Sequence, residues 1–272
     1  MKNPLLLLLC FLLLSCGGQQ EGANEQTDDA APESIQISQS DSDSLRTVFN
    51  NFYKKRKDWF PSKFVFEAGK LNPVDEALKD TAFFIFREEL LEAVRQKDAF
   101  HLLEKTDGNI KYSFGDDGGL PGFVQMWELD SPEGIERSPV WETLEDVLTK
   151  GGSFSDNGKT FTAPYFYGLF PEEYDAFTYG LIIGTGVRMR SEPNLRAPVV
   201  KSLSYDIVEI VGKTASFETI GGEEHPWVQV KLLDGREGYV WGKFIGSPIG
   251  FRAGFSRQEN GSWLMHFFVA GD

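Results

Sequence analysis

Two adjacent carboxylates, Asp116 and Asp117, lie in a glycine-rich loop that runs from residue 115 to residue 122. Paired carboxylates are the groups that bind calcium or supply a general acid and base. An EF-hand loop places its acids at alternating positions and ends in a glutamate, and this loop does neither. A catalytic pair normally comes from separate elements around a cleft, and nothing pairs either aspartate with Glu128. We therefore expect a tight turn with solvated aspartates rather than a calcium or catalytic site.

Cysteine and histidine chemistry is scarce in this chain. Its two cysteines, Cys10 and Cys16, both lie in the N-terminal apolar segment, so the rest of the chain has no thiol nucleophile, disulfide framework or cysteine zinc site. The three histidines, His101, His225 and His266, are too scattered to favour a metal site or a triad. The chain also lacks a GxSxG elbow and a phosphate loop. We therefore expect that the protein is not an enzyme and that it binds neither a cofactor nor a metal.

The charge is strongly acidic. Forty-one Asp and Glu face 27 Lys and Arg, which gives a formal net charge of −14, and none of the acids lies in the first twenty residues. Such a surface repels the phosphates of nucleic acids and of anionic lipids. A nucleic acid is therefore not an expected partner.

The N-terminus has the features of an export signal. Lys2 precedes an apolar run that is too short to cross a bilayer of roughly 30 Å as a helix. The segment 13–16 (LLSC) resembles a bacterial lipobox, which implies a signal peptide over residues 1–15, cleavage before Cys16 and acylation of that cysteine. Gly17 rather than Asp follows, which favours the outer membrane. The alternative is an ordinary signal peptide with an incidental cysteine.

Residues 16–44 follow as a polar segment without aromatic side chains. Such a segment cannot bury enough apolar surface to offset the entropy of ordering it. We expect a disordered tether, lipidated at Cys16, that links the membrane to the folded body. Alternatively, residues 33–38 (ESIQIS) alternate in polarity and could add a strand.

Residues 45–179 predict an α+β domain that begins with helices and ends with strands. Apolar residues recur at helical spacing from Leu45, and Asp98 is placed to cap a short helix over 98–105. Residues 54–57 (KKRK) fit a solvated helix end better than a site for anionic lipid or polymer. Residues 154–166 predict a hairpin around Asn157-Gly158. The aromatic run 165–171 either lines a ligand groove or packs this domain on the next one, and we favour the packing role.

Two segments further along resemble a bacterial SH3-type (SH3b) domain. Residues 187–193 (VRMRSEP) resemble its opening signature, with Arg188 in place of the usual Asn, and residues 234–245 (DGREGYVWGKFI) resemble its closing one, with Tyr239 in place of the usual Trp. The resemblance implies a small β-barrel over residues 180–246. In alternating strands Val187 and Met189 would then face inward, while Arg188 and Arg190 face outward. Residues 212–224 are expected to form an inserted loop.

SH3b domains often accompany cell-wall hydrolases, where they hold peptidoglycan, and they also occur in proteins without a known ligand. The resemblance therefore assigns no ligand-contact residue here. We take as the candidate binding surface the residues Arg188, Arg190, Trp227, Tyr239 and Trp241. Four short segments also resemble segments of SH3 domain-containing lipoproteins of Bacteroidetes type, at residues 64–67, 112–115, 162–166 and 267–272. This resemblance implies no activity.

Residues 247–272 predict a final hairpin around Asn260-Gly261, with Trp263, Met265, Phe267 and Val269 on one face of a strand. A lone hairpin is marginal in water, so its apolar face needs a partner sheet. Either the hairpin returns to complete the sheet of the 45–179 domain, or it extends the barrel. We expect the return, which makes the barrel an insertion in a discontinuous α+β domain.

Together these features predict a non-catalytic envelope lipoprotein of the α+β class, anchored in a membrane through Cys16. Its SH3-like module would bind a cell-wall polymer such as peptidoglycan, or an envelope protein. The alternatives are an assembly protein without a wall ligand and, less favoured, a cell-wall hydrolase.

Overall fold

The computed structural model describes residues 39–56, 60–115 and 118–271. The predicted signal peptide, Cys16, most of the predicted tether, and both Asp116 and Asp117 lie outside the described residues. The chain divides into two compact units, residues 1–42 and 43–272. Of the first unit, only the start of helix α1 is described. Within the described residues, no helix is long and apolar enough to cross a membrane.

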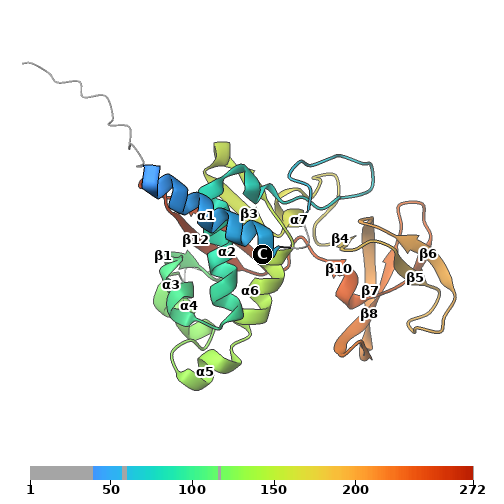
Figure 1. The fold of residues 1–272 in the computed structure, drawn as a ribbon. Coiled ribbons are helices and arrows are strands. Elements are labelled where there is room, and N and C mark those ends of the chain that lie inside the picture. The colour runs from blue at the N-terminus through green and yellow to red at the C-terminus, as the bar shows by residue number, and fades with distance from the viewer. Residues whose placement is uncertain (1–38, 57–59, 116–117, 272) are drawn as a thin grey trace, which may run out of the picture. The chain divides into compact units, whose positions relative to one another are not determined.

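The fold belongs to the mixed α+β class, as expected (Figure 1). Its helices are α1 (Gln39–Lys55), η1 (Glu76–Lys79), α2 (Thr81–Arg95), α3 (Ala99–Glu104), α4 (Leu120–Met126), α5 (Pro132–Arg137), α6 (Val140–Thr149), η2 (Asp156–Gly158), α7 (Tyr165–Gly168) and η3 (Gly242–Phe244). Its strands are β1 (Thr106–Lys111), β2 (Ser153–Ser155), β3 (Thr160–Ala163), β4 (Tyr179–Ile182), β5 (Val187–Arg190), β6 (Val199–Leu203), β7 (Ile207–Ile220), β8 (Glu223–Lys231), β9 (Glu237–Trp241), β10 (Ile245–Gly246), β11 (Arg252–Arg257) and β12 (Trp263–Val269). Helix α1 begins at Gln39, so residues 39–44 are helical and do not belong to the disordered tether that we predicted over 16–44.

The strands of the described residues form two sheets. The first has five strands in the order β1-β12-β11-β3-β2, and the second has seven in the order β10-β4-β7-β8-β9-β5-β6. The final hairpin, β11–β12, lies in the middle of the first sheet, where β12 pairs in parallel with β1 and β11 pairs antiparallel with β3. The hairpin therefore returns to the N-terminal sheet, which confirms the prediction. The second sheet is antiparallel and curls into a half-barrel.

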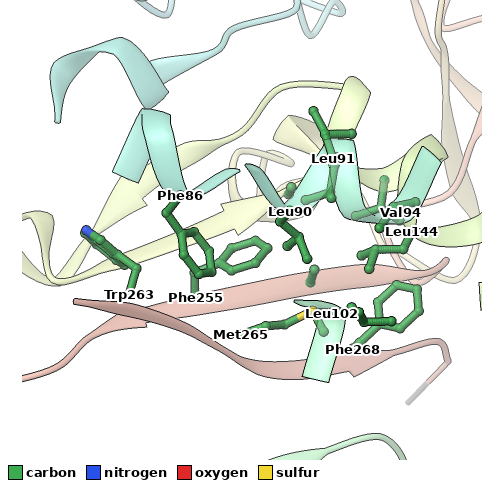
Figure 2. Close-up of a cluster of buried hydrophobic side chains, with 14 of the residues drawn as sticks. Phe86, Leu90, Leu91, Val94, Leu102, Leu144, Phe255, Trp263, Met265 and Phe268 are labelled. Atoms are coloured by element: carbon green, nitrogen blue, oxygen red, sulfur yellow. The ribbon is translucent and has the colours of Figure 1, made fainter. Parts of the chain in front are cut away.

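Helix α2 packs on the five-stranded sheet and builds the main core (Figure 2). Helix α2 begins at Thr81 because the preceding Asp80 caps it. The Asp80 carboxylate accepts a hydrogen bond from the Phe83 N–H, which satisfies one of the free donors of the first turn. Phe83 is fully buried, and its ring centroid lies 4.2 Å from that of Phe161 on β3 and 4.9 Å from that of Trp263 on β12. One aromatic side chain thus joins segments that are 180 residues apart in the sequence.

A β-bulge in the final hairpin changes which side chains face this core. Gly254 pairs with Phe267 but Phe255 pairs with Met265, so His266 is the extra residue. Beyond the bulge the alternation is inverted, and Phe268 rather than Phe267 enters the core. The prediction that Phe267 and Val269 share a face with Trp263 and Met265 is therefore wrong.

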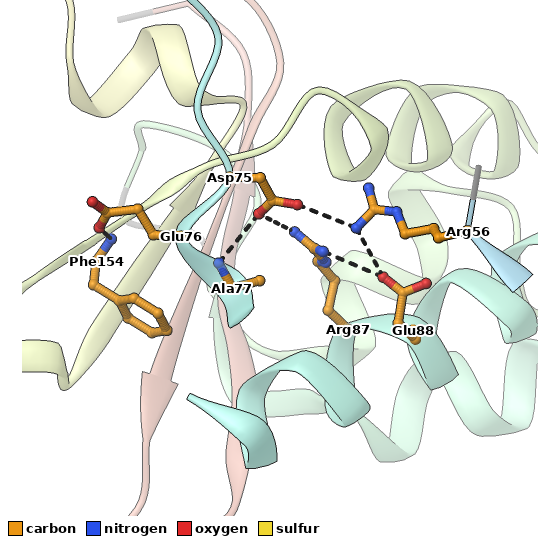
Figure 3. A network of polar contacts seen from close by, with 7 residues as sticks. All are labelled: Arg56, Asp75, Glu76, Ala77, Arg87, Glu88 and Phe154. Atoms are coloured by element: carbon orange, nitrogen blue, oxygen red, sulfur yellow. Dashed lines mark hydrogen bonds and ion pairs between the residues drawn. The ribbon is translucent and has the colours of Figure 1, made fainter. Parts of the chain in front are cut away.

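Four charged side chains form a buried network where η1 meets α2 (Figure 3). The fully buried Arg87 donates to Asp75 at 2.6 Å and to Glu88 at 3.3 Å, and Arg56 donates to both carboxylates at 3.2 Å. Glu88, which we expected to face outward from α2, is only 7% exposed. Arg56, predicted to be solvated in the basic cluster 54–57, is instead largely buried because it neutralises these acids.

Asp75 makes the stability of the fold depend on pH. Burial opposes its ionisation, but the Arg87 and Arg56 guanidinium groups and the Ala77 N–H outweigh burial and hold the pKa of Asp75 below its usual value. A carboxylate with a lowered folded-state pKa stabilises the fold above its unfolded pKa of about 4 and loses that contribution as the pH falls through the folded pKa. We expect Asp75→Asn to lower the free energy of unfolding at pH 7 by about 3 kcal/mol, because it leaves Arg87 undercompensated. It should also remove part of the loss of stability below pH 4.

Urea unfolding from pH 3 to pH 7 measures both effects. Asp146→Asn, which removes an exposed acid paired with Lys150, is the matched control and should change little. Parallel pH curves for wild type and Asp75→Asn would show that Asp75 does not carry this dependence.

Candidate functional site

The half-barrel has a core face and an opposite face, and strand alternation sorts its side chains between them. Met189 on β5, Val228 on β8 and Val240 on β9 are fully or almost fully buried in the half-barrel core. Their neighbours along each strand point to the opposite face. The expected inward direction of Val187 and Met189 is confirmed.

Strand register brings the candidate residues together on this opposite face. Arg190 pairs with Tyr239, and two residues further along β9 Trp241 lies directly opposite Trp227 on β8. Arg188, two residues before Arg190, shares its face. All five residues of the predicted binding surface therefore lie on one side of β5, β9 and β8.

Residues 212–224, predicted as a loop, continue the β7–β8 pair almost to its tip. Strand β7 runs to Ile220, and the turn at Gly221-Gly222 uses two positive φ angles, 66° and 91°, that glycine adopts without strain. Two register shifts interrupt the pairing between residues 210 and 217. Backbone pairing between β7 and β8 explains why this segment forms strands despite its polar composition.

Glu218 on this hairpin holds both tryptophans of the opposite face. Its carboxylate accepts a hydrogen bond from the indole Nε1–H of Trp227, and its backbone oxygen accepts one from the indole Nε1–H of Trp241 at 3.2 Å. The ring of His225 packs edge-on to Trp241 with centroids 5.0 Å apart. Both indoles are therefore fixed in orientation, and each is less than a tenth exposed.

The opposite face carries a groove of about 380 Å³. Four of the five predicted residues line it, whereas Tyr239 lies on the same face outside the lining. The remaining lining includes three apolar side chains that sequence reasoning missed. Leu195 comes from the loop after β5, Ile220 from the end of the unexpected β7 extension, and Phe244 from η3. The only sequence signal for Phe244 is its place in the closing SH3b-like segment.

The two arginines of the groove differ in exposure. Arg188 is exposed, whereas Arg190 is 8% exposed and donates a hydrogen bond to the Ala197 carbonyl at 2.7 Å. That bond closes the loop between β5 and β6 and positions Leu195 within it. The groove thus combines apolar walls, indole edges and two guanidinium groups.

A second cavity, of about 220 Å³, lies on the α+β body. There the Arg252 guanidinium lies 5.1 Å from the ring centre of Phe114 and 4.8 Å from that of Tyr167, and Phe267 completes the aromatic lining. The β-bulge places Phe267 here. This cavity is smaller than the groove.

The aromatic run 165–171 divides between two roles. Tyr165 and Phe166 are buried with Leu71, Leu181 from β4 and Ile207 from β7, which is the packing role that we favoured. Burial raises the pKa of Tyr165, whose hydroxyl donates to the Leu71 carbonyl at 3.3 Å. Tyr167 instead lines the second cavity.

The described residues hold no group of three or more His, Cys, Asp or Glu that could bind a metal. His101 pairs with Asp98 at 2.7 Å and His225 with Glu223 at 3.6 Å, on separate elements. Glu128 is exposed in the turn after α4. Asp116 and Asp117 lie outside the described residues, so the structure does not bear on their role.

Comparison of the chain with protein-family models, curated proteins and solved structures finds no match. The resemblance to SH3b domains therefore depends on residues 187–193 and 234–245. In the structure these are β5 with the loop after it, and the turn into β9 through to β10. Gly238 permits β9 to lie close to β5, because a Cβ there would lie 2.7 Å from the Arg190 carbonyl oxygen.

Glu218 should control the order of the hairpin beside the groove. Glu218→Ala removes the acceptor of the Trp227 indole N–H, and a hydrogen bond to a charged group contributes about 1.5–3 kcal/mol. We expect amide hydrogen exchange in residues 214–226 to become roughly tenfold faster or more, whereas Glu218→Gln, which keeps an oxygen acceptor, should exchange much closer to the wild-type rate. Equal exchange in wild type and Glu218→Ala would show that this bond does not hold the hairpin.

Proposed function

We propose that this protein is a non-catalytic, lipid-anchored protein of the bacterial cell envelope whose half-barrel binds the cell-wall polymer peptidoglycan. One observation carries the binding role. Residues from the four strands β5, β7, β8 and β9, from η3 and from the loop after β5 converge on a single groove that is apolar, aromatic and positively charged. The anchor and the envelope location come from the lipobox-like segment before Cys16.

The groove suits an extended polymer that has apolar and polar groups in alternation. Apolar side chains and indole edges supply contact area, and a few polar groups set orientation, which is the usual composition of a ligand site. Because Glu218 holds both indoles, ligand binding costs little side-chain entropy at these two positions.

A binding role without catalysis fits the chemistry of the lining. Among the described residues, no carboxylate, histidine or cysteine side chain lines the groove. Hydrolysis of a glycan or an amide needs an acid–base group, a nucleophile or a metal at the bound polymer. The lining therefore supports retention of a polymer rather than its cleavage.

The second candidate is an assembly protein that binds another envelope protein instead of the wall. Strand β6 is an edge of the seven-stranded sheet, and its Val199 and Val200 are 49% and 37% exposed. An edge strand offers unpaired backbone groups to a strand of another protein. Crosslinking followed by co-purification separates this role from wall binding.

Sedimentation with insoluble peptidoglycan tests the proposed function. We expect the full chain, purified in detergent, to pellet with peptidoglycan well above bovine albumin. Leu195→Ser removes a half-exposed apolar wall of the groove and should weaken binding by roughly threefold to tenfold. Leu233→Ser, on an equally exposed leucine of the half-barrel outside the groove lining, is the matched control and should bind like wild type. Enrichment no greater than that of albumin would overturn the proposal.

Acylation of Cys16 is tested separately. Expressed in a bacterium with labelled palmitate, the wild-type chain and Cys10→Ser should both incorporate the label, whereas Cys16→Ser should not. More than one acyl chain gives stable attachment, so the labelled chains should also fractionate with membranes. Label retained in Cys16→Ser would refute the lipobox interpretation.

A further inference from the structure

We infer that the groove recognises a carboxylate group of a peptide, held by Arg188 and Arg190 and flanked by an apolar part of the same ligand. This inference rests on the proposed function, because it names the chemical group that the same groove binds. It assigns to the two arginines the role of selecting the ligand.

The first support is the state of Arg190. Its side chain is more than nine-tenths buried, and the acceptor of its hydrogen bond is a neutral carbonyl, that of Ala197. Among the described residues, neither Arg190 nor Arg188 forms an ion pair. Burying a cation without an anionic partner is costly, so its persistence at a cavity wall points to a partner that arrives with the ligand.

The second support is the contrast with Arg87. That arginine is also buried, and it contacts two carboxylates, those of Asp75 and Glu88. The chain has 14 more acids than bases, so acids to pair with are abundant. Among the described residues Arg190, unlike Arg87, is buried without a carboxylate partner, and it lines the groove.

The third support is Glu218, an acid that accepts hydrogen bonds from both tryptophans of the groove. Its carboxylate accepts from the Trp227 indole, and it forms no ion pair with either arginine. The Glu218 carboxylate thus orients the Trp227 side chain at the wall of the groove. The positive charge of the groove stays available to a ligand.

The same features define the ligand. A guanidinium binds a carboxylate through two parallel hydrogen bonds, and Leu195, Ile220 and Phe244 cover an adjacent apolar group. A polyanion is disfavoured because the whole chain carries a charge of −14. The ligand is therefore a peptide chain with a local carboxylate and few other charges, rather than a phosphate polymer.

Chemical masking of the wall tests this inference. Insoluble peptidoglycan is divided, and the carboxyl groups of one half are converted to amides with a carbodiimide and ethanolamine. We expect wild type to bind the amidated half about tenfold more weakly, since a charge-assisted hydrogen bond contributes on this scale. Arg188→Gln, which changes an exposed side chain, should bind both halves equally and weakly. Arg196→Gln removes an exposed arginine from the neighbouring loop outside the groove lining and should behave like wild type.

The outcomes separate the two proposals. Equal wild-type binding to both halves overturns the carboxylate inference and leaves wall binding intact. Binding to neither half overturns the proposed function, and the inference is then decided by a soluble probe. That probe is the peptide acetyl-Leu-Ala-Ala, as the free acid or as the C-terminal amide. Each form is titrated into the full chain while the tryptophan fluorescence of the protein is recorded. The inference is supported if the free acid changes the fluorescence at a lower peptide concentration than the amide does, and if Arg188→Gln removes this difference. Equal fluorescence changes with the two peptides, or no change with either, overturn the inference.

Discussion

The burial of Phe83 against β3, β11 and β12 is the contact on which the rest of the structure depends. Its ring reaches Phe161, Phe255 and Trp263, so helix α2 and the strands β11 and β12 stabilise each other. The α+β core cannot be complete until the chain has passed through the half-barrel and returned. The half-barrel starts at β4 and ends at β10, and these two strands pair with each other, with Ile182 opposite Ile245. A module whose ends are neighbours can be inserted into a sheet without disturbing it.

Much of this arrangement could be predicted from local sequence signals. Asn-Gly pairs at 157–158 and 260–261 fall at the turns between β2 and β3 and between β11 and β12, and Asp98 caps α3 as expected. The need of a lone hairpin for a partner sheet predicted its return. These predictions succeed because each depends on a few neighbouring residues and on one physical requirement.

The features that sequence reasoning missed depend on long-range partners. Nothing local marks His266 as a bulge, because the extra residue is defined only by the pairing of β11 with β12. From the sequence, Glu88 and Arg56 are expected to be solvated charges. They are largely buried because the fold places Asp75 and Arg87 next to them. Ile220 lines the groove because a polar segment forms strands when its two halves pair. The five candidate residues could be placed on one face by alternation, but the apolar walls between them could not.

The half-barrel uses its charges differently from the α+β body. In the body, the buried guanidinium group of Arg87 and the carboxylates of Asp75 and Glu88 satisfy one another, and the network fixes η1 against α2. In the half-barrel, Glu218 is committed to an indole and Arg190 to a backbone carbonyl. The energy of a buried charge without a counterion is a cost to the empty groove, and any ligand group that supplies the counterion recovers it. Under the proposed function, stability and binding are therefore opposed at Arg190, whereas at Arg87 charge pairing serves stability.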